Sequence, residues 1–399
     1  MPRSAEAANA KAGADDPVGD LRVPITEDPS PSSGPPSPPS RFSESLATHR
    51  MRMKTVLLPG DFVNLGDAML SLAAGRRVLQ DGRQCVLMPY KTPSDKIREE
   101  FETAGLKIVP IRANPARAFR ACLRSSIRIG GGHAIRNEVS LGWLAFTVAV
   151  CFWAVVCGHC AAVVGAGATS IRSRWKKFCF QLIFDRCTEI NLRDAVSLSV
   201  LQAEFPTSAA KMKQTGDLAF LKGCLPLRPD LNASDTCLVS PGIDSGESRN
   251  EDPKEILTAL RRLHEREGLK RVLIVSHDLR EDFGLSFCRA LGVTIGRELP
   301  VEVSLIVSDG VADGLLAPYG HAHWIVTGRL HGLIIGALQS REVIYTRGSA
   351  AKLKPFADLF GFTSVDDMGR THATDARQPS LASALGTQQR AAELNFADR

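Results

Sequence analysis

Aromatic side chains are scarce in this 399-residue sequence, at 6% against 44% hydrophobic residues, so aliphatic side chains must dominate its cores. No block of Lys and Arg indicates nucleic acid as the main partner, and the formal net charge of +6 is small for this length. An anionic small molecule or membrane surface is compatible with that charge. A chain of this size can bury two cores of ordinary domain size.

The sequence also lacks the cysteine spacing that is typical of metal-binding sites. The ten cysteines are scattered, and most lie in apolar stretches, so we expect them to be reduced and packed. Cys157 and Cys160, with His159 between them, form the one cluster, but a structural zinc site needs a second pair of ligands. We expect packing for this pair, and no ligand spacing in the sequence implies a bound metal.

Large apolar side chains are few in residues 1–52, and residues 29–40 consist of Pro, Ser and Gly alone. Such a segment buries too little surface to offset its chain entropy, so we expect a disordered tail. The tail has no apolar core of a secretory signal, and its acidic residues argue against a transit peptide. These features lead us to expect a cytoplasmic protein.

Residues 141–156 are nearly all apolar, and a second apolar stretch follows at 161–164. Read as one segment, the two would reach the length of a membrane-spanning helix. Gly158 and His159 instead divide them into a helix and a short strand, which is the arrangement we expect. A helix with so apolar a surface has to cover a sheet or touch a membrane or partner, which leaves peripheral membrane contact open.

Strand-like and helix-like segments alternate over residues 53–222 and again over residues 236–365. This alternation predicts two parallel sheets with helical crossovers, and two Rossmann-like domains facing across a cleft are the simplest arrangement. Residues 223–235 read as a linker between the domains. Residues 366–399 read as a polar tail, in which 380–395 has the composition of a helix that could return to the first domain.

The first domain opens with an apolar strand at 53–58, a loop, and an apolar helix at 68–79. The loop lacks the GxGxxG spacing, so a dinucleotide cofactor has little support. Asn64 and Asp67 stand where the helix begins. Asp67 is expected either to cap this helix or to act on a substrate.

Two later strands of the first domain also end in residues suited to ligand binding. A strand at 126–129 ends in consecutive glycines that include Gly131 and Gly132, where a ligand or a neighbouring backbone can approach closely. A strand at 189–192 is followed by Arg193 at the start of a helix. Ligands of open α/β sheets usually bind outside the carboxyl ends of the strands.

Residues 322–338 are the most informative stretch, because a strand-like run at 323–326 turns into an apolar segment of helical length. Arg329 and His331 fall at that turn, where a helix N-terminus adds N–H donors and positive potential. Arg329 offers a planar fork for carboxylate or phosphate, and the ordinary pKa of histidine suits proton transfer near neutrality. Taken alone, such a pair would more often be an arginine bound to a local carboxylate and a core histidine.

The order of these segments resembles that of the polysaccharide pyruvyl transferase family over residues 53–362. The most specific element is Gly328-Arg-Leu-His-Gly332 between its apolar strand and helix. The other matching elements are Asn64-x-Gly-Asp67, Gly130-Gly-Gly132, Arg193-Asp-x-x-Ser197, Gly216-Asp217, His277-Asp278 and Lys352.

This resemblance implies a fold like that of GT-B glycosyltransferases and transfer of pyruvate from phosphoenolpyruvate onto a glycan or lipid-linked saccharide as a ketal. It places the acceptor on the N-terminal domain and the donor on the C-terminal domain, with no cofactor besides the donor substrate. The sequence departs from the family pattern at 165–170, which lacks a turn ending in Gly-Pro, and at 340–342, which lacks a proline. These departures concern the acceptor contacts and the floor of the cleft more than the donor site.

Phosphoenolpyruvate carries a carboxylate and a phosphate, so its site needs cations and a group that transfers protons. We assign His331 to acid/base work and Arg329 to an anionic group of the donor, with Asp67 as a base for the acceptor hydroxyl. Arg193 is assigned to the second anionic group. The remaining substrate-binding candidates are Lys352, for the phosphate, and Asn64, Gly131, Gly132 and His277.

Two rival functions would use the same cleft. A GT-B-like glycosyltransferase would bind a nucleotide-sugar and place its diphosphate on the cations. A non-enzymatic relative would bind a glycan without releasing phosphate.

Overall fold

The structure is a computed structural model that describes residues 54–60, 62–132, 134–227, 234–242, 252–278, 280–346, 350–368 and 380–397. The tail predicted at 1–52 lies outside these ranges. Residues 228–233 of the predicted linker and residues 369–379 of the predicted C-terminal tail also lie outside them.

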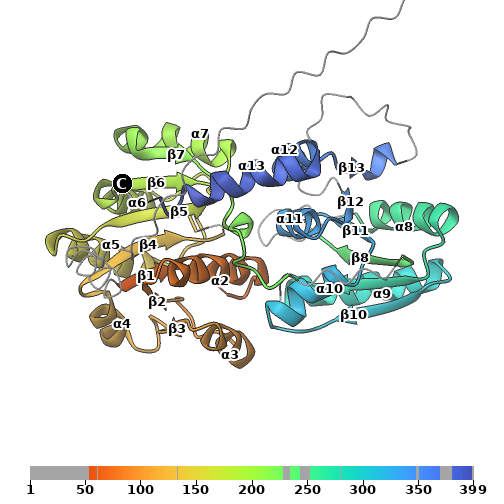
Figure 1. The fold of residues 1–399 in the computed structure, drawn as a ribbon, viewed down its shortest axis with the longest axis horizontal. Helices are drawn as coiled ribbons and strands as arrows, with labels where there is room; N and C mark the ends of the chain where they lie inside the picture. The colour runs from red at the N-terminus through yellow and green to blue at the C-terminus, as the bar shows by residue number, and fades with distance from the viewer. Residues whose placement is uncertain are drawn as a thin grey trace, which may run out of the picture. The chain divides into compact units, whose positions relative to one another are not determined.

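The first sheet has seven parallel strands in the order β3-β2-β1-β4-β5-β6-β7 (Figure 1). The order runs outward from β1 in both directions, as in a Rossmann-like domain. Two of the inner strands, β4 and β5, are buried along their whole length, as expected of a parallel sheet covered on both faces. The strands are β1 (Lys54–Leu58), β2 (Gln84–Leu87), β3 (Lys107–Ile108), β4 (Ser125–Gly130), β5 (Ala161–Ala166), β6 (Glu189–Leu192) and β7 (Met212–Gln214). The helices are α2 (Leu65–Gln80), α3 (Asp95–Thr103), α4 (Pro115–Cys122), α5 (Leu141–Val156), α6 (Arg174–Arg186) and α7 (Ala195–Glu204), with short turns η1 (Pro206–Lys211) and η2 (Leu218–Phe220).

The second sheet has six parallel strands in the order β10-β9-β8-β11-β12-β13. Its central strands, β8 and β11, are fully buried. The strands are β8 (Thr236–Ser240), β9 (Arg271–Val275), β10 (Glu302–Ile306), β11 (Trp324–Thr327), β12 (Glu342–Tyr345) and β13 (Thr363–Ser364). The helices are α8 (Pro253–Glu267), η3 (Glu281–Leu285), α9 (Ser286–Glu298), η4 (Ala312–Leu316), α10 (Ala317–Gly320), α11 (Leu330–Leu338), α12 (Ala350–Phe360), η6 (Val365–Asp367) and α13 (Leu381–Glu393).

The two parallel α/β domains predicted from the sequence are confirmed, although several elements were not anticipated, among them α4, β7, β10 and β13. Strand β10 lies at the edge of its sheet, and its side chains are mostly half-exposed, which hides the apolar signal of a buried strand. Helix α4 has clear start signals, because Asn114 accepts a hydrogen bond from the Arg117 N–H at 3.0 Å and a proline follows it. Its eight residues are too few to display a helical period.

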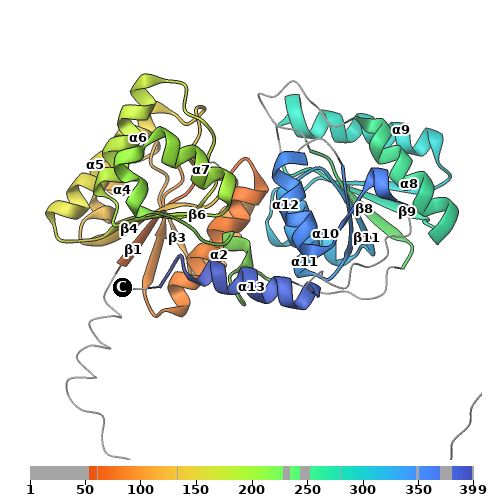
Figure 2. The same cartoon turned by 90° about the horizontal axis from the view of Figure 1, so that it is seen from above.

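One hydrophobic core crosses from the first domain into the second. It joins Leu65 and Met69 of α2 to Leu315 and Leu333 of the second domain. A separate core lies between the first sheet and α4, α5 and α6, which Figure 2 shows together on the side of the sheet opposite α2. Helix α2 is therefore the element of the first domain that packs most directly on the second.

Residues Leu141–Val156 form helix α5 as predicted, and β5 follows it. Among the ranges described above, no helix has the length and apolar character needed to cross a membrane. The expected packing of Cys157 and Cys160 is wrong, because both side chains are exposed in the turn between α5 and β5. The helix ends at Val156, so these residues flank a surface turn at Gly158, whose φ is +74°.

The last helix, α13, returns to the first domain (Figure 1). A Cβ at Gly216 would overlap the backbone of Ala392 in this helix, so only glycine permits the contact. Asn395 is fully buried and accepts hydrogen bonds from the Gly165 N–H at 2.7 Å and the Thr215 hydroxyl at 2.9 Å. It also donates to the Gly216 carbonyl at 3.1 Å.

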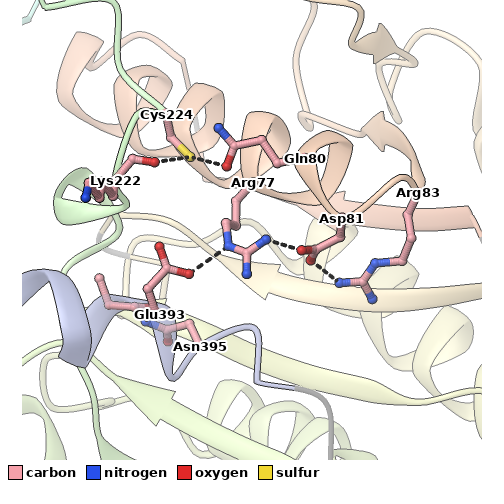
Figure 3. Close-up of polar contacts among 9 residues, drawn as sticks. Arg77, Gln80, Asp81, Arg83, Lys222, Cys224, Glu393 and Asn395 are labelled. Carbon is pink, nitrogen blue, oxygen red and sulfur yellow. Dashed lines mark hydrogen bonds and ion pairs between the residues drawn. The ribbon is translucent and has the colours of Figure 1, made fainter. Parts of the chain in front are cut away.

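A second contact links α13 to α2. Arg77 donates through Nε to Glu393 at 2.7 Å and also pairs with Asp81 (Figure 3). Asp81 in turn accepts from Arg83 at 2.8 Å. These side chains are partly exposed, so the ion pairs add little energy, and the buried Asn395 is the stronger attachment.

Replacing Asn395 with Ala should lower the free energy of unfolding by about 2–3 kcal/mol, because buried backbone groups of the first domain lose their partner. Chemical denaturation followed by tryptophan fluorescence measures the change. Arg390→Ala on the exposed side of α13 is the matched control and should change stability by less than about 0.5 kcal/mol. Equal effects of the two substitutions would contradict the role given to Asn395.

Candidate active site

The turn between β11 and α11 is held by a network around Thr327. The buried Thr327 hydroxyl donates to the Ser240 carbonyl at 3.0 Å and accepts from the Arg329 N–H at 3.0 Å. Arg329 occupies the N-cap position of α11, where it makes no side-chain capping hydrogen bond, and its Nε donates to the Pro241 carbonyl at 2.8 Å. The turn thus fixes the guanidinium of Arg329 at a helix N-terminus, where anions bind favourably.

His331 lies in the first turn of α11 and packs against Gly66 at the start of α2. A Cβ at Gly66 would overlap the His331 ring, so the ring fits only because residue 66 is glycine. The residue is half-buried, whereas its Nε2 atom is shielded from solvent and has no hydrogen-bond partner within the described ranges. A buried polar atom without a partner is costly, which marks this nitrogen as a position for substrate contact.

Burial lowers the pKa of His331 to about 3, and the positive charges of Arg193 and Arg329 act in the same direction. The ring is therefore neutral near pH 7 when the site holds no anion. A neutral imidazole has one nitrogen that donates and one that accepts, so it can receive a proton.

The N-terminus of α2 is capped by Asn64, whose side-chain oxygen accepts from the Gly66 N–H at 2.9 Å. The Leu65 N–H donates to the His277 carbonyl of the second domain at 2.9 Å, and Asn64 forms an antiparallel bridge with Asp278. The capping role considered for Asp67 therefore belongs to Asn64. These contacts hold the start of α2 directly against the second domain.

Asp67 is buried and packs against the glycine turn after β4. A Cβ at Gly132 would overlap the Asp67 carboxylate, and Gly131 and Gly132 have φ values of +88° and +70°. Gly130 is required for another reason, since a Cβ there would overlap the Val164 carbonyl. The sequence prediction that these glycines permit a close approach is confirmed, and the approaching groups are a carboxylate and a backbone.

Arg193 follows β6 and is almost fully buried. Its Nη1 donates to Asp217 and its Nε to Asp194, each at 3.3 Å, and Gly167 leaves room for its guanidinium. Burial raises the pKa of Asp217, and the charge of Arg193 opposes that shift. The two carboxylates orient Arg193, so its position is fixed before any ligand binds.

The segment that departs from the family pattern at 165–170 packs around this arginine. Besides the space at Gly167, the Ala168 N–H donates to the Ser197 hydroxyl at 2.9 Å. At the other departure, Ser340 has a φ of +54° and Arg341 donates to the Gly320 carbonyl at 2.6 Å. Both segments thus have defined structural roles in this chain.

His277 is buried, and its Nε2 lies 2.9 Å from the Tyr319 hydroxyl. Burial holds its pKa well below the ordinary value, and Arg329 and His331 add to that effect. The buried His277 ring is thus a structural neighbour of Arg329 and His331. Direct contact of His277 with a substrate stays a prediction. Lys352 lies in α12, but its side chain is outside the described part of the structure.

A cavity of about 380 Å³ opens beside Arg193 and Leu330. Its wall is largely apolar and includes Val200 from α7 and Phe356 and Leu359 from α12. Residues of both domains therefore line one pocket next to the cations.

The structure brings Arg193, Arg329, His331 and Gly66 together, and the charges of both arginines act on the histidine ring. Such a site can bind an anion with two acidic groups and exchange a proton with it. Sequence reasoning named Asp194 and Asp217 as elements of the family pattern but did not assign them to orient Arg193, and it missed the hydroxyl of Tyr319. Asp217 had a signal, because it follows a glycine at a strand end, whereas Tyr319 had none.

A family model described as polysaccharide pyruvyl transferase matches residues 64–347. A glycosyltransferase from Rickettsia africae ESF-5 has a similar structure, with a TM-score of 0.57 and 11% identity over 86% of this chain and 96% of that chain. No curated protein matches the sequence.

Two further solved structures share the fold. UGT73P12 of Glycyrrhiza uralensis, complexed with glycyrrhetinic acid 3-O-monoglucuronide, has a TM-score of 0.50 at 10% identity, over 87% of this chain and 93% of that one. S. aureus MnaA with UDP has a TM-score of 0.50 at 12% identity, over 86% and 94%. At such identities the likeness shows the fold alone, and it confirms the GT-B-like architecture.

Substituting Gly132 with Ala should destabilise the protein by more than the same change at Gly82. Both glycines have φ near +70°, but a Cβ at Gly82 meets no atom within 4 Å, whereas one at Gly132 meets the Asp67 carboxylate. Gly82→Ala therefore isolates the backbone cost, about 1 kcal/mol, and the excess at Gly132 measures the clash. Urea denaturation measures the loss of stability in each variant. When Asp67 is also replaced by Ala, the excess loss caused by Gly132→Ala should become smaller. Full additivity of the two substitutions would contradict the packing described.

Proposed function

The chain belongs to the polysaccharide pyruvyl transferase family, and from this we propose that it transfers pyruvate from phosphoenolpyruvate onto two hydroxyls of a glycan or lipid-linked saccharide as a ketal. The observation that carries the proposal is the shielded Nε2 of His331 in the field of Arg193 and Arg329. A donor with two anionic groups and a carbon that must accept a proton fits that combination.

In the proposed donor complex, Arg329 binds one anionic group at the N-terminus of α11 and Arg193 binds the other. Both guanidiniums are already fixed, by the Pro241 carbonyl in one case and by Asp194 and Asp217 in the other. Prior orientation reduces the entropy lost on binding. Lys352 of α12 remains a further candidate for the phosphate.

The proposed reaction begins when the methylene carbon of phosphoenolpyruvate takes up a proton and becomes a methyl group. The neighbouring carbon gains oxocarbenium character, and a first acceptor hydroxyl attacks it and loses its proton. The bond from that carbon to the phosphate oxygen then breaks, and a second hydroxyl adds with loss of its proton. Two protons are consumed, by the methyl group and by the released phosphate, and the two hydroxyls supply them.

His331 is the group we assign to the proton on the methylene carbon. In the absence of an anion the ring is neutral, because burial and both arginines lower its pKa. A bound dianion offsets the positive charges, so the pKa of His331 rises and the ring takes up the proton that it then donates. Donor binding thus prepares the acid.

Asp67 is the proposed base for the acceptor hydroxyl. Its carboxylate lies at the glycine turn of the first domain, beside Gly132 and near Gly60. Gly131 and Gly132 of that turn and Asn64 at the N-cap of α2 are assigned to the acceptor. The apolar cavity beside Arg193 offers space for the part of the acceptor next to the reacting sugar.

We expect His331→Gln to reduce turnover by about 100-fold or more while donor affinity changes little, because a proton donor acts mainly on the chemical step. Arg329→Ala should weaken donor binding itself, and Arg329→Lys should also fail, since lysine lacks the planar fork. Phosphate release from phosphoenolpyruvate with a panel of glycans gives turnover, and donor-dependent thermal shift gives binding. A folded His331→Gln enzyme with near-normal turnover would refute the assignment.

The same two measurements separate the rival functions. A nucleotide-sugar that shifts the melting temperature when phosphoenolpyruvate does not would favour a glycosyltransferase. Glycan binding without phosphate release in any mixture would favour a non-enzymatic relative.

Donor affinity should also depend on pH through His331. Because its pKa is about 3 without ligand and rises when the dianion binds, protons are taken up on binding and affinity strengthens as pH falls toward neutrality. The contribution of one group is at most about tenfold per pH unit. Calorimetry in buffers of different ionisation enthalpy counts the protons taken up when the donor binds. The His331→Gln variant corrects for titration of the ligand and should take up fewer protons than the wild-type chain. An equal number of protons in the two proteins would argue against this coupling.

A further inference from the structure

The outward face of α5 is apolar along its whole length. Helix α5 contains no charged residue, and its exposed side chains follow a helical repeat that runs on the side opposite the buried Trp143 and Val150. Leu141 is 57% exposed at one end and Phe152 is 52% exposed near the other. The other residues of this face that keep surface are Ala145, Val148, Ala149, Trp153, Val155 and Val156.

Helix α6 packs beside α5 and extends this apolar face. Its Trp175 is 75% exposed and its Phe178 is 56% exposed, whereas Phe180, Ile183 and Phe184 are buried against the sheet. We call the exposed side chains of α5 together with Trp175 and Phe178 the α5–α6 face.

Basic side chains predominate in the part of the chain that carries the α5–α6 face. Arg186 of α6 lies over the Phe152 ring, with its Cζ 5.7 Å from the ring centroid. Between residues 111 and 188 the sequence has only two acidic residues, Glu138 and Asp185. The exposed basic residues of the same stretch are Arg112, Arg117, Arg120, Arg124, Arg172 and Arg174.

We propose that the α5–α6 face binds reversibly to the surface of an anionic phospholipid bilayer. An apolar stripe about 24 Å long matches a helix that lies in the plane of the interface. The exposed Trp175 suits the headgroup level, where indole rings accumulate. The arginines complement anionic lipids, whose negative surface potential attracts basic side chains.

A bilayer fits these features better than a protein partner does. A protein interface usually surrounds its apolar contacts with polar groups that match those of the partner. The chain around this face instead carries mostly positive charge, and its apolar side chains project outward from the helices. A bilayer surface supplies apolar depth and negative charge over any length. No substrate is needed for this contact, so it can be tested apart from the proposed activity.

The full chain should float with phosphatidylcholine vesicles that contain phosphatidylglycerol, and binding should weaken in pure phosphatidylcholine and at high salt. Phe152→Ser combined with Trp175→Ser should weaken binding to the anionic vesicles by about tenfold or more. The matched control is Val293→Ser with Val307→Ser, which removes two apolar side chains of the second domain that are 54% and 56% exposed. Thermal melts verify that both double variants are folded.

A second pair of variants tests the charge. Arg172→Glu with Arg174→Glu should reduce binding to anionic vesicles, whereas Lys254→Glu with Arg266→Glu on α8 should leave it unchanged. The proposal is overturned if the wild-type chain binds no vesicle or if the Phe152 and Trp175 variant binds as well as its control. It is also overturned if that variant instead abolishes self-association seen by sedimentation, because a second copy would then be the occupant. Phosphate release with a water-soluble saccharide should be unchanged in all these variants, so a failure of vesicle binding is distinct from a failure of the proposed chemistry.

Discussion

The packing of the His331 ring on Gly66 is the contact on which the rest of the site depends. It brings the N-termini of α11 and α2 together, one from each domain, and nothing larger than hydrogen fits at residue 66. The same approach is secured by the hydrogen bond from Leu65 to the His277 carbonyl and by the core shared between the domains. Two positive helix ends and two arginines are thereby concentrated in a partly buried place, which disfavours a protonated histidine until an anion arrives.

Much of this arrangement could be predicted from the sequence, because it follows from parallel-sheet topology. Arg193 and Arg329 each come directly after a strand, and the carboxyl ends of parallel strands lie along one edge of a sheet. Once both domains are recognised, these residues are expected to meet at the cleft. The strand that precedes Arg193, β6, has the bounds predicted from its apolar pattern, and so does helix α5.

The sequence could not predict contacts that depend on which of several similar side chains is nearest. Asn64 and Asp67 are both residue types that often cap a helix N-terminus. Only the path of the loop makes Asn64 the cap of α2 and places the Asp67 carboxylate against Gly132. Asp217 meets Arg193 from a different strand end, and Asn395 comes from a helix far along the chain. Helix α6 shows the same limit, since an exposed Phe178 and a buried Phe180 look alike in a sequence.

The α5–α6 face and the candidate active site share one edge of the first sheet. Helix α5 begins after the glycine turn that follows β4, and α6 begins after β5, so the N-terminal ends of both helices lie at the edge where Arg193 follows β6. Leu141 and Trp175 are exposed apolar residues at the N-terminal ends of these two helices. A bilayer bound along α5 and α6, as proposed, would therefore lie near the edge of the sheet where the proposed acceptor site begins. A saccharide attached to a lipid could then enter the cleft while its anchor stays in the membrane, which links the membrane contact to the lipid-linked class of acceptor.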